Sequence, residues 1–489
     1  MNDMVYNDLE RLIDEKKQRW THASDEIWSY AETKFQETRS SELLCSLLKQ
    51  EGFDVETGVA GLPTAFAASF GSGTPVIAFL GEYDALSGLS QQERLAEKKP
   101  LEEGGNGHGC GHHLLGVGSL AAAVAVKEIL KKNKLPGTVR YYGCPGEEGG
   151  SGKAFMARAG VFEDVDAALT WHPLTHNAIW STRFLANYQV AFRFHGKSSH
   201  AASAPHVGRS ALDAVELMNI GVNYLREHVV PDARMHYAIT NSGGASPNVV
   251  QSEAEVLYLL RAPELAQVQD IYERVCAIAH GAALMTGTTH EVLFQKACSN
   301  YIPNNALETV MYRHLQQVTL PALPANEQEL AQQLHQTMTQ EDLQNDLHMA
   351  ELLLGGQHRE LLPGIREQLV ADSVLPHVYA ASLLPGSSDV GDVSWLVPTA
   401  QCSTACYVFG TPGHSWQMVA QGTSSLAHQG MLTSAKVLAR TALELFSQPE
   451  QIQLAKAELL QTLDGRTYQC PIPQDIQPPL ETNTKKANT

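Results

Sequence analysis

Short apolar runs alternate with longer amphipathic segments along the N-terminal part of the chain. Residues 75–80, 138–143 and 166–171 are short and largely apolar, which is typical of strands buried on both faces of a sheet. Residues 5–50 have apolar positions at helical spacing and predict two helices, and residues 114–126 predict a buried helix. Strands that alternate with helices predict an α/β fold with a central, mostly parallel sheet.

The pattern changes near residue 187. Residues 188–194 alternate between apolar and polar side chains, as in an antiparallel strand with one solvated face. Further strands are expected at residues 248–250, 254–261 and 291–295, and helices at residues 210–227 and 263–284. We therefore predict an α+β module at residues 187–302, called the inserted module below. It would interrupt an α/β domain formed by residues 1–186 and 303–489.

The second part of the α/β domain has a segment rich in Gln, Glu and Leu at about residues 318–372. This composition predicts an extra helical region. Residues 405–409 predict a strand, and residues 424–446 predict a long amphipathic helix. The Pro- and Thr-rich tail from about Gln469 is expected to be irregular.

The chain has 489 residues and a formal net charge of −18. This length exceeds one ordinary core, and the negative charge argues against nucleic acid or an anionic membrane surface as a partner. The longest apolar run, residues 114–126, is too short to span a bilayer, and the acidic start lacks a signal-peptide pattern. Eight cysteines with no Cys-x-x-Cys pair are typical of a reducing compartment, so we expect a cytoplasmic protein.

Polar side chains with metal-binding chemistry follow the predicted strands. They are Glu82, Asp84, Cys110, His112, Glu147, Glu148, His172 and His414. Because ligands bind at the carboxyl ends of the strands in open α/β sheets, we expect these side chains to converge there. A mixture of thiolate, imidazole and carboxylate suits zinc, manganese, cobalt or nickel, whereas calcium prefers oxygen ligands alone. So many candidates indicate two cations a few ångströms apart.

Two local patterns carry most of this prediction. Cys110 and His112 flank Gly111, and a glycine allows the sharp turn that brings a thiolate and an imidazole together. Glu147 and Glu148 are adjacent carboxylates that cannot easily face one cation together. One of them is expected to bind metal while the other accepts a proton from a water molecule. The sequence has no Gly-x-Ser-x-Gly nucleophile elbow and no His-Glu-x-x-His motif.

Six short motifs, in their order and spacing, resemble those of the M20 metallopeptidase clan, in its amidohydrolase and carboxypeptidase-like branch. They are Gly-Glu-Tyr-Asp-Ala-Leu at 81–86, Gly-Cys-Gly-His at 109–112, Gly-Glu-Glu at 146–148, Trp-His-Pro at 171–173, Ser-His-Ala at 199–201 and Asn-Val-Val at 248–250. The resemblance extends over nearly the whole chain. One departure is His113, which stands where many members of the branch have Asp.

The resemblance implies two divalent metal ions, manganese or zinc. It implies five metal ligands, namely Cys110, His112, Glu148, His172 and His414. By the same similarity Cys110 would bridge the two ions, Glu147 would be the general base, and Asp84 would orient a ligand.

The inserted module would be a lid and dimerisation domain. From it, His200 would reach across a dimer to the scissile carbonyl of the substrate. Asn248 and Arg261 would bind the substrate, Arg261 through a carboxylate.

The implied activity is hydrolysis of an amide bond to an amino acid, foremost the bond between aminobenzoate and glutamate in folate breakdown products. The alternatives are a dipeptidase, another N-acyl amino acid amidohydrolase, and a subunit that is active only with a related partner chain. The expected partners are a small acyl-amino acid and a second subunit, in a homodimer or a heterodimer. We expect neither nucleic acid nor a membrane as a partner.

Overall fold

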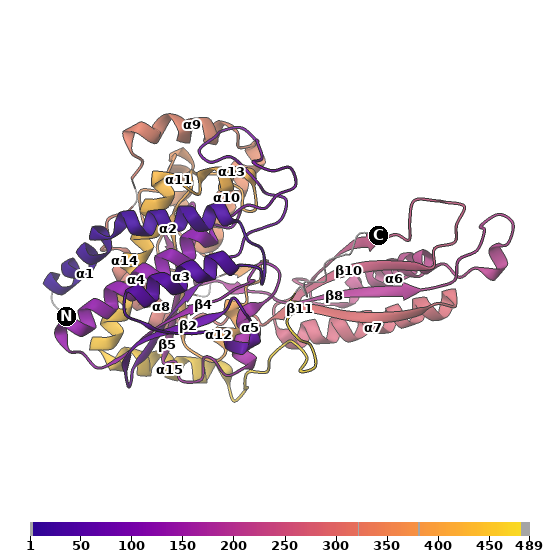
Figure 1. The fold of residues 1–489 in the computed structure, drawn as a ribbon, viewed down its shortest axis with the longest axis horizontal. Helices are drawn as coiled ribbons and strands as arrows, with labels where there is room; N and C mark the ends of the chain where they lie inside the picture. Colours follow the sequence, from indigo (N-terminus) through magenta and orange to yellow (C-terminus); the bar gives the residue numbers. More distant parts are fainter. Residues whose placement is uncertain (1–2, 321, 380–381, 481–489) are drawn as a thin grey trace.

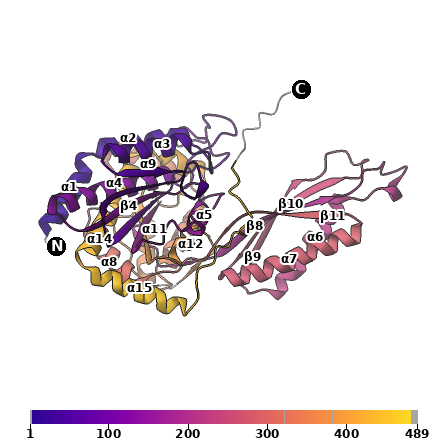
Figure 2. The same ribbon diagram turned by 60° about the horizontal axis from the view of Figure 1, so that its bottom comes forward.

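The computed structural model describes residues 3–320, 322–379 and 382–480. The molecule is elongated, with a helix-covered α/β part from which a smaller arm projects (Figure 1). A rotated view shows the same arm extending from one side of the larger part (Figure 2). The arm carries four strands and two helices of the inserted module.

The larger part is built on a seven-stranded sheet. Its strand order is β1 (Asp54–Thr57), β2 (Phe66–Ser72), β4 (Gly137–Gly143), β3 (Val76–Gly81), β5 (Ala167–Leu174), β13 (Thr399–Ala405) and β6 (Ala178–Ile179). The four central strands, from β4 to β13, run parallel, and the outer strands pair antiparallel. The predicted α/β class is confirmed, and the sheet is mixed because its edges are antiparallel.

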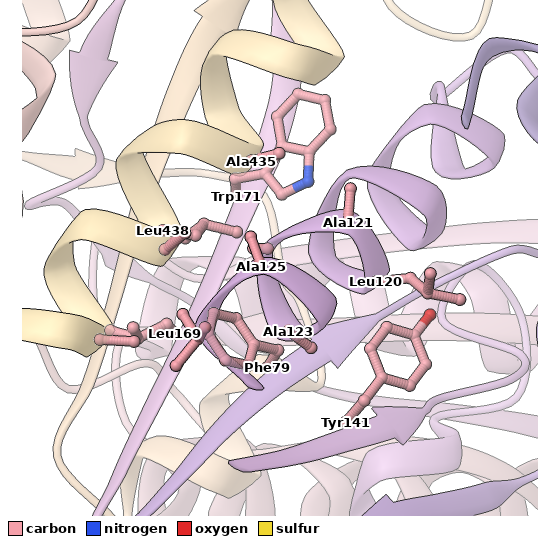
Figure 3. Close-up of a cluster of buried hydrophobic side chains, with 14 of the residues drawn as sticks. Phe79, Leu120, Ala121, Ala123, Ala125, Tyr141, Leu169, Trp171, Ala435 and Leu438 are labelled. Carbon is pink, nitrogen blue, oxygen red and sulfur yellow. The ribbon is translucent and has the colours of Figure 1, made fainter. Parts of the chain in front are cut away.

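Both faces of the central strands are buried, which explains their continuous apolar runs. On β3, Ile77 and Phe79 face one core while Val76, Ala78 and Leu80 face another. The first core contains residues of α1 (Asp3–Glu15), α2 (Lys17–Tyr30), α3 (Thr38–Gln50), α4 (His112–Asn133), α8 (Asn305–Leu315), α14 (Ser425–Ser447) and α15 (Pro449–Leu463). In its centre, alanines of α4 and α14 allow both helices to approach the aromatic rings of the sheet (Figure 3).

The opposite face of the sheet is covered by two short helices, α5 (Gly152–Arg158) and α12 (Val390–Ser394). The extra helical region forms α9 (Gln328–Gln336), α10 (Gln340–Leu353) and α11 (Leu362–Glu367). It lies beside the short helix α13 (Trp416–Gln421) at one end of the α/β part (Figure 1). A two-strand ladder of β7 (Arg183–Phe184) and β12 (Leu383–Leu384) lies next to the connection to the arm.

The arm contains a four-stranded antiparallel sheet. Its order is β11 (Thr289–Cys298), β8 (Ala186–His195), β10 (Glu253–Ala262) and β9 (Arg234–Asn241). Helices α6 (Ala211–Leu225) and α7 (Leu265–Thr286) cover one face. Alternate residues of β10 are buried under these helices, which leaves the side chain of Arg261 on the opposite face.

Helix α4 is longer than the apolar run that predicted it. The helix is long and apolar enough to cross a bilayer, yet 94% of its most apolar stretch is buried within the fold. It is therefore placed as a core helix between the sheet and the surrounding helices.

Three predicted elements were wrong in detail. Residues 5–50 form three helices, because the chain breaks at Lys16 and again after Tyr30, where Ala31 adopts a left-handed conformation. Residues 248–250 are not a strand. The strand that pairs with β10 is β9, Arg234–Asn241, and because most of its residues are exposed, its sequence lacks a clear alternation of apolar and polar side chains. The strand predicted at 405–409 ends at Ala405, and the apolar residues after it are buried in a loop. Part of the predicted irregular tail, residues 481–489, lies outside the described residues.

Candidate metal centre

The turn between Cys110 and His112 requires glycine. Gly111 has φ of +80°, in the left-handed region, and precedes the first residue of α4. A Cβ atom there would lie 2.4 Å from the Tyr407 hydroxyl and 2.5 Å from Cγ of Pro173. The glycine therefore provides both the turn and the space that let Cys110 and His112 face one point.

Asp84 fixes the orientation of two neighbours. Its Oδ1 lies 2.8 Å from Nδ1 of His112, and its Oδ2 accepts a 2.9 Å hydrogen bond from the backbone N–H of Glu148. The other ring nitrogen of His112, Nε2, is buried and makes no hydrogen bond of good geometry, with Glu82 Oε2 3.3 Å away. A carboxylate behind a histidine in this way holds the ring and directs its free nitrogen outward, as around metal ions.

His172 is held from its other side. Its Nδ1 lies 3.2 Å from the carbonyl oxygen of Pro173, and its ring stacks on Trp180 with a centroid separation of 5.3 Å. Its Nε2 is 3.4 Å from the sulfur of Cys110. Burial and the neighbouring His112 lower the pKa of His172 to about 3, so the imidazole is neutral and its Nε2 is available as a ligand.

Candidate ligand atoms gather in groups within 4.8 Å of one another. One group is Cys110, His112 and His172, and a second is Cys110, Glu148 and His414. These two groups share only Cys110, so its sulfur lies where a bridge between two cations would be. The loop bearing His414 is fixed by a 2.9 Å hydrogen bond from its backbone N–H to the carbonyl of Gly109.

The two adjacent glutamates differ in electrostatic environment. Burial, reinforced by the nearby Glu82, raises the pKa of Glu147 to about 8. Burial would also raise the pKa of Glu148, but its contact with His414 and the charge of His112 outweigh that effect and lower the pKa to about 2. The structure therefore distinguishes an anionic carboxylate suited to metal from a carboxyl suited to proton transfer.

The side chains fit a pair of divalent transition metals. His112 Nε2 and Glu148 Oε1 are both buried and make no hydrogen bond of good geometry, although Glu82 Oε2 lies 3.3 Å from the first and His414 Nε2 lies 3.2 Å from the second. Buried polar atoms that are satisfied so poorly are costly, and a cation would satisfy both. The sulfur, nitrogen and oxygen donors together favour zinc or manganese over a hard alkaline-earth ion.

A cavity of about 340 Å³ opens beside the cluster and is lined by both structural parts. The inserted module contributes Asn187, Arg261 and Lys296 to its wall. The buried polar atoms around it that lack hydrogen-bond partners include Asn187 Oδ1, Arg261 Nε, Ser387 Oγ and Gln401 Nε2. Lys296 Nζ donates a 2.9 Å hydrogen bond to the backbone carbonyl of Glu148. The inserted module therefore presents two cations to the candidate ligands from its side of the cavity.

Two predicted residues lie away from both the cavity and the cluster of candidate ligands. His200 and Asn248 are exposed in adjacent loops of the inserted module, joined by a backbone bridge between His200 and Val249. His200 Nδ1 accepts from the backbone N–H groups of Ala202 and Ser203, both at 3.2 Å. Arg261, in contrast, lines the cavity as expected for a substrate-binding residue.

A buried ionic group near Glu147 was not predicted from the sequence. Lys153 is fully buried, and its Nζ lies 2.6 Å from both Glu82 Oε1 and Asp389 Oδ1. The remaining oxygen of Glu82 is 3.3 Å from His112 Nε2. Lys153 therefore compensates the negative charges that surround the proposed base. Nothing in the segment around Lys153 distinguishes it from a solvated lysine after a glycine-rich loop.

Comparison with known proteins gives consistent matches. Residues 78–359 match the family described as peptidase family M20/M25/M40. One subunit of p-aminobenzoyl-glutamate hydrolase from Escherichia coli (strain K12) is 51% identical over 474 residues, covering 97% of this chain and 98% of that protein. An Xaa-Arg dipeptidase from Mus musculus is 33% identical over 308 residues, covering 60% of this chain and 67% of the dipeptidase.

A solved structure has the same fold. It is a dinuclear metal-binding peptidase of the M20 family from Bacillus subtilis, with a TM-score of 0.54 and 16% sequence identity. The match covers 89% of this chain and 99% of that one. At this identity the likeness establishes the fold and nothing finer.

Proposed function

Because this chain belongs to peptidase family M20/M25/M40 and is a metal-dependent hydrolase, we propose that its substrate is an N-acyl glutamate, foremost p-aminobenzoyl-glutamate. One observation carries the proposal: a cavity with two cations, Arg261 and Lys296, adjoins the cluster of candidate ligands. A glutamate leaving group has two carboxylates, and an acidic protein needs local cations to bind it.

We assign the metal ligands as Cys110, His112, Glu148, His172 and His414, which would hold two ions of zinc or manganese. When bound, the two ions supply Lewis acidity toward the scissile carbonyl and an attacking water molecule. Asp84 keeps the His112 ring in place, and Cys110 belongs to both groups.

Glu147 has the proton-transfer role. Its carboxylate accepts the proton of the attacking water and then delivers it to the leaving amine nitrogen. Its raised pKa favours that delivery, because a carboxyl with a pKa near 8 holds a proton more readily than an ordinary glutamate. Lys153 prevents the neighbouring Glu82 and Asp389 from raising this pKa still further.

The exposed position of His200 supports a role in a neighbouring chain. Within its own chain, His200 does not line the cavity, so it would reach a substrate only from a second protomer. The adjacent edge strand β9 exposes Tyr237 and Ile239, which would suit an interface. The Escherichia coli hydrolase has two differently named subunits, both related to this chain, so the second protomer is either another copy or a related chain. Asn248 would contribute from the same loop cluster.

The main alternative is a dipeptidase, as in the relative that acts on Xaa-Arg. The cavity argues against a basic leaving residue here, since Arg261 and Lys296 would repel it. An acidic leaving residue is attracted by the same pair.

The test is hydrolysis by metal-reconstituted protein, alone and mixed with a related second chain. The substrates are p-aminobenzoyl-glutamate, its glutamine and alanine counterparts, and an Xaa-Arg dipeptide. We expect two metals per chain and strongest hydrolysis of the glutamate compound, with Glu147→Gln as the inactive control. Preference for the Xaa-Arg dipeptide, or absence of hydrolysis in every mixture despite two bound metals, would contradict the proposal.

A further inference from the structure

Helix α10, in the extra helical region, contacts two loops. One follows β5, which carries His172, and the other follows β13 and leads to His414. Its residue Asp346 has a side chain only 9% exposed, although it belongs to a helix at the periphery of the α/β part. Burial of a carboxylate is costly unless donors compensate it. The donors come from two loops that are far apart in the sequence.

The first loop continues from β5, the strand that carries His172. The hydroxyl of Thr175 donates a 2.7 Å hydrogen bond to Asp346 Oδ1, and His176 Nε2 lies 3.2 Å from the same oxygen. Thr175 is three residues beyond His172. This carboxylate oxygen therefore holds the loop immediately after one candidate ligand.

The second loop precedes His414. The backbone N–H of Gly410 donates a 2.7 Å hydrogen bond to Asp346 Oδ2. Gly410 has φ of +85°, and a Cβ atom there would lie 2.4 Å from Cδ2 of Leu343 on the same helix. Glycine therefore allows α10 to approach the backbone of this loop closely.

Other contacts bring the same two loops against the extra helical region and the segment that directly follows it. Phe409 N–H donates to the Leu369 carbonyl at 2.9 Å, and Leu375 N–H donates to the Asn177 carbonyl at 2.9 Å. Phe409 also packs in one apolar cluster with residues of α10. Asp346 contacts both loops directly, one with each carboxylate oxygen.

We propose that Asp346 is a positioning residue that sets the separation between the loop after His172 and the loop before His414, so that both imidazoles reach the candidate metal centre at Cys110. The inference rests on the metal centre proposed above. It gives the extra helical region a role, which is to hold the loop after His172 and the loop before His414 at a fixed separation. Supporting groups behind metal ligands typically contribute 10- to 100-fold to metal affinity or activity.

The test compares two aspartates of the same helix. Asp346→Ala removes the carboxylate that joins the loops. Asp342→Ala removes the capping box at the start of α10, where Asp342 binds Thr339 and contacts neither loop. Metal affinity is measured by competition with a chromophoric chelator, melting temperature by calorimetry, and kcat and KM with the reconstituted protein.

We expect Asp346→Ala to weaken metal binding 10- to 100-fold and to lower kcat, with little change in KM because Arg261 and Lys296 belong to the inserted module. Asp342→Ala should lower the melting temperature while leaving metal affinity unchanged. Thr175→Val, which removes one of the bonds with little change in shape, should give a smaller loss of affinity. It also tests the inference if Asp346→Ala does not fold.

Wild-type metal affinity in both Asp346→Ala and Thr175→Val would overturn the inference, and so would an equal loss of affinity in Asp342→Ala. A wild-type protein that binds no metal would instead refute the proposed metal centre, so the two failures are distinguishable.

Discussion

Arg261 offers a direct test of how the cavity recognises its substrate. It lies near the end of β10, and the strand holds its backbone in register with Asn187. Its Nε is buried without a hydrogen-bond partner, and burial lowers its pKa from the ordinary value of an arginine. A guanidinium kept in this state has unused donors for a substrate carboxylate. The perturbation is Arg261→Lys, which keeps the charge and removes the planar pair of donors.

The size of the effect follows from the hydrogen bonds lost. A guanidinium donates two parallel bonds to a carboxylate, whereas an ammonium at the same distance donates one. A hydrogen bond to a charged group contributes about 1.5–3 kcal/mol. Since about 1.4 kcal/mol corresponds to a factor of ten, kcat/KM for p-aminobenzoyl-glutamate should fall roughly 10- to 150-fold.

The assay compares the free diacid with its two mono-amides, in which one carboxylate at a time is replaced. Arg261→Lys should lose activity toward the diacid and toward the amide that keeps the recognised carboxylate, but little toward the other amide. Arg193→Lys is the matched control, because Arg193 lies on the neighbouring strand, pairs with Glu255 and does not line the cavity. An equal loss of kcat/KM for the diacid and both amides would show that Arg261 does not recognise a substrate carboxylate.

Three further predictions concern the base, the second protomer and the fold. Glu147→Gln should keep both metals by elemental analysis and lose about 10²- to 10⁴-fold in kcat, because the amide cannot accept a proton; near-normal turnover would rule out the assignment. His200→Ala should lower kcat without loss of metal, and mixing it with Glu147→Gln should restore activity, since one mixed site has both intact groups; no recovery despite measured exchange of protomers would exclude a role across the dimer. Burial raises the pKa of Asp392 to about 7 from 3.8, so the folded state binds the extra proton, and the contribution of this group to stability is fully present below about pH 4 and is lost as pH rises through about 7. Asp392→Asn should flatten that decline in melting temperature between about pH 5 and pH 8, and an unchanged slope would show that Asp392 does not titrate there.

Much of the α/β part follows from local sequence. The run at β3 is apolar on both faces, which occurs when helices cover both sides of a sheet, and the structure has that arrangement. The candidate ligands were found for a related reason. Side chains that closely follow parallel strands share one edge of the sheet, so the convergence of Asp84, Glu147 and Glu148 is predictable from strand ends. The left-handed turn at Gly111 was likewise implied by a single glycine between two ligand types.

Elements that depend on partners distant in sequence were less predictable. The edge strand β9 is exposed along most of its length, so its apolar alternation is weak, and its hydrogen bonding to β10 alone defines it as a strand. Residues 406–409 look like a strand because they are apolar, but apolarity reports burial and not hydrogen bonding.

The sequence by itself determined the kinds of atoms available to the site, because thiol, imidazole and carboxylate chemistry is a property of residue type. Tertiary structure alone decided their states. Glu147 and Glu148 are adjacent and chemically identical, yet burial near Glu82 raises one pKa to about 8 while His414 and His112 lower the other to about 2. Lys153 and Asp346 are ordinary charged residues in the sequence, and only the fold buries them among groups distant along the chain. Electrostatic energies depend on distance and burial, which local sequence does not specify.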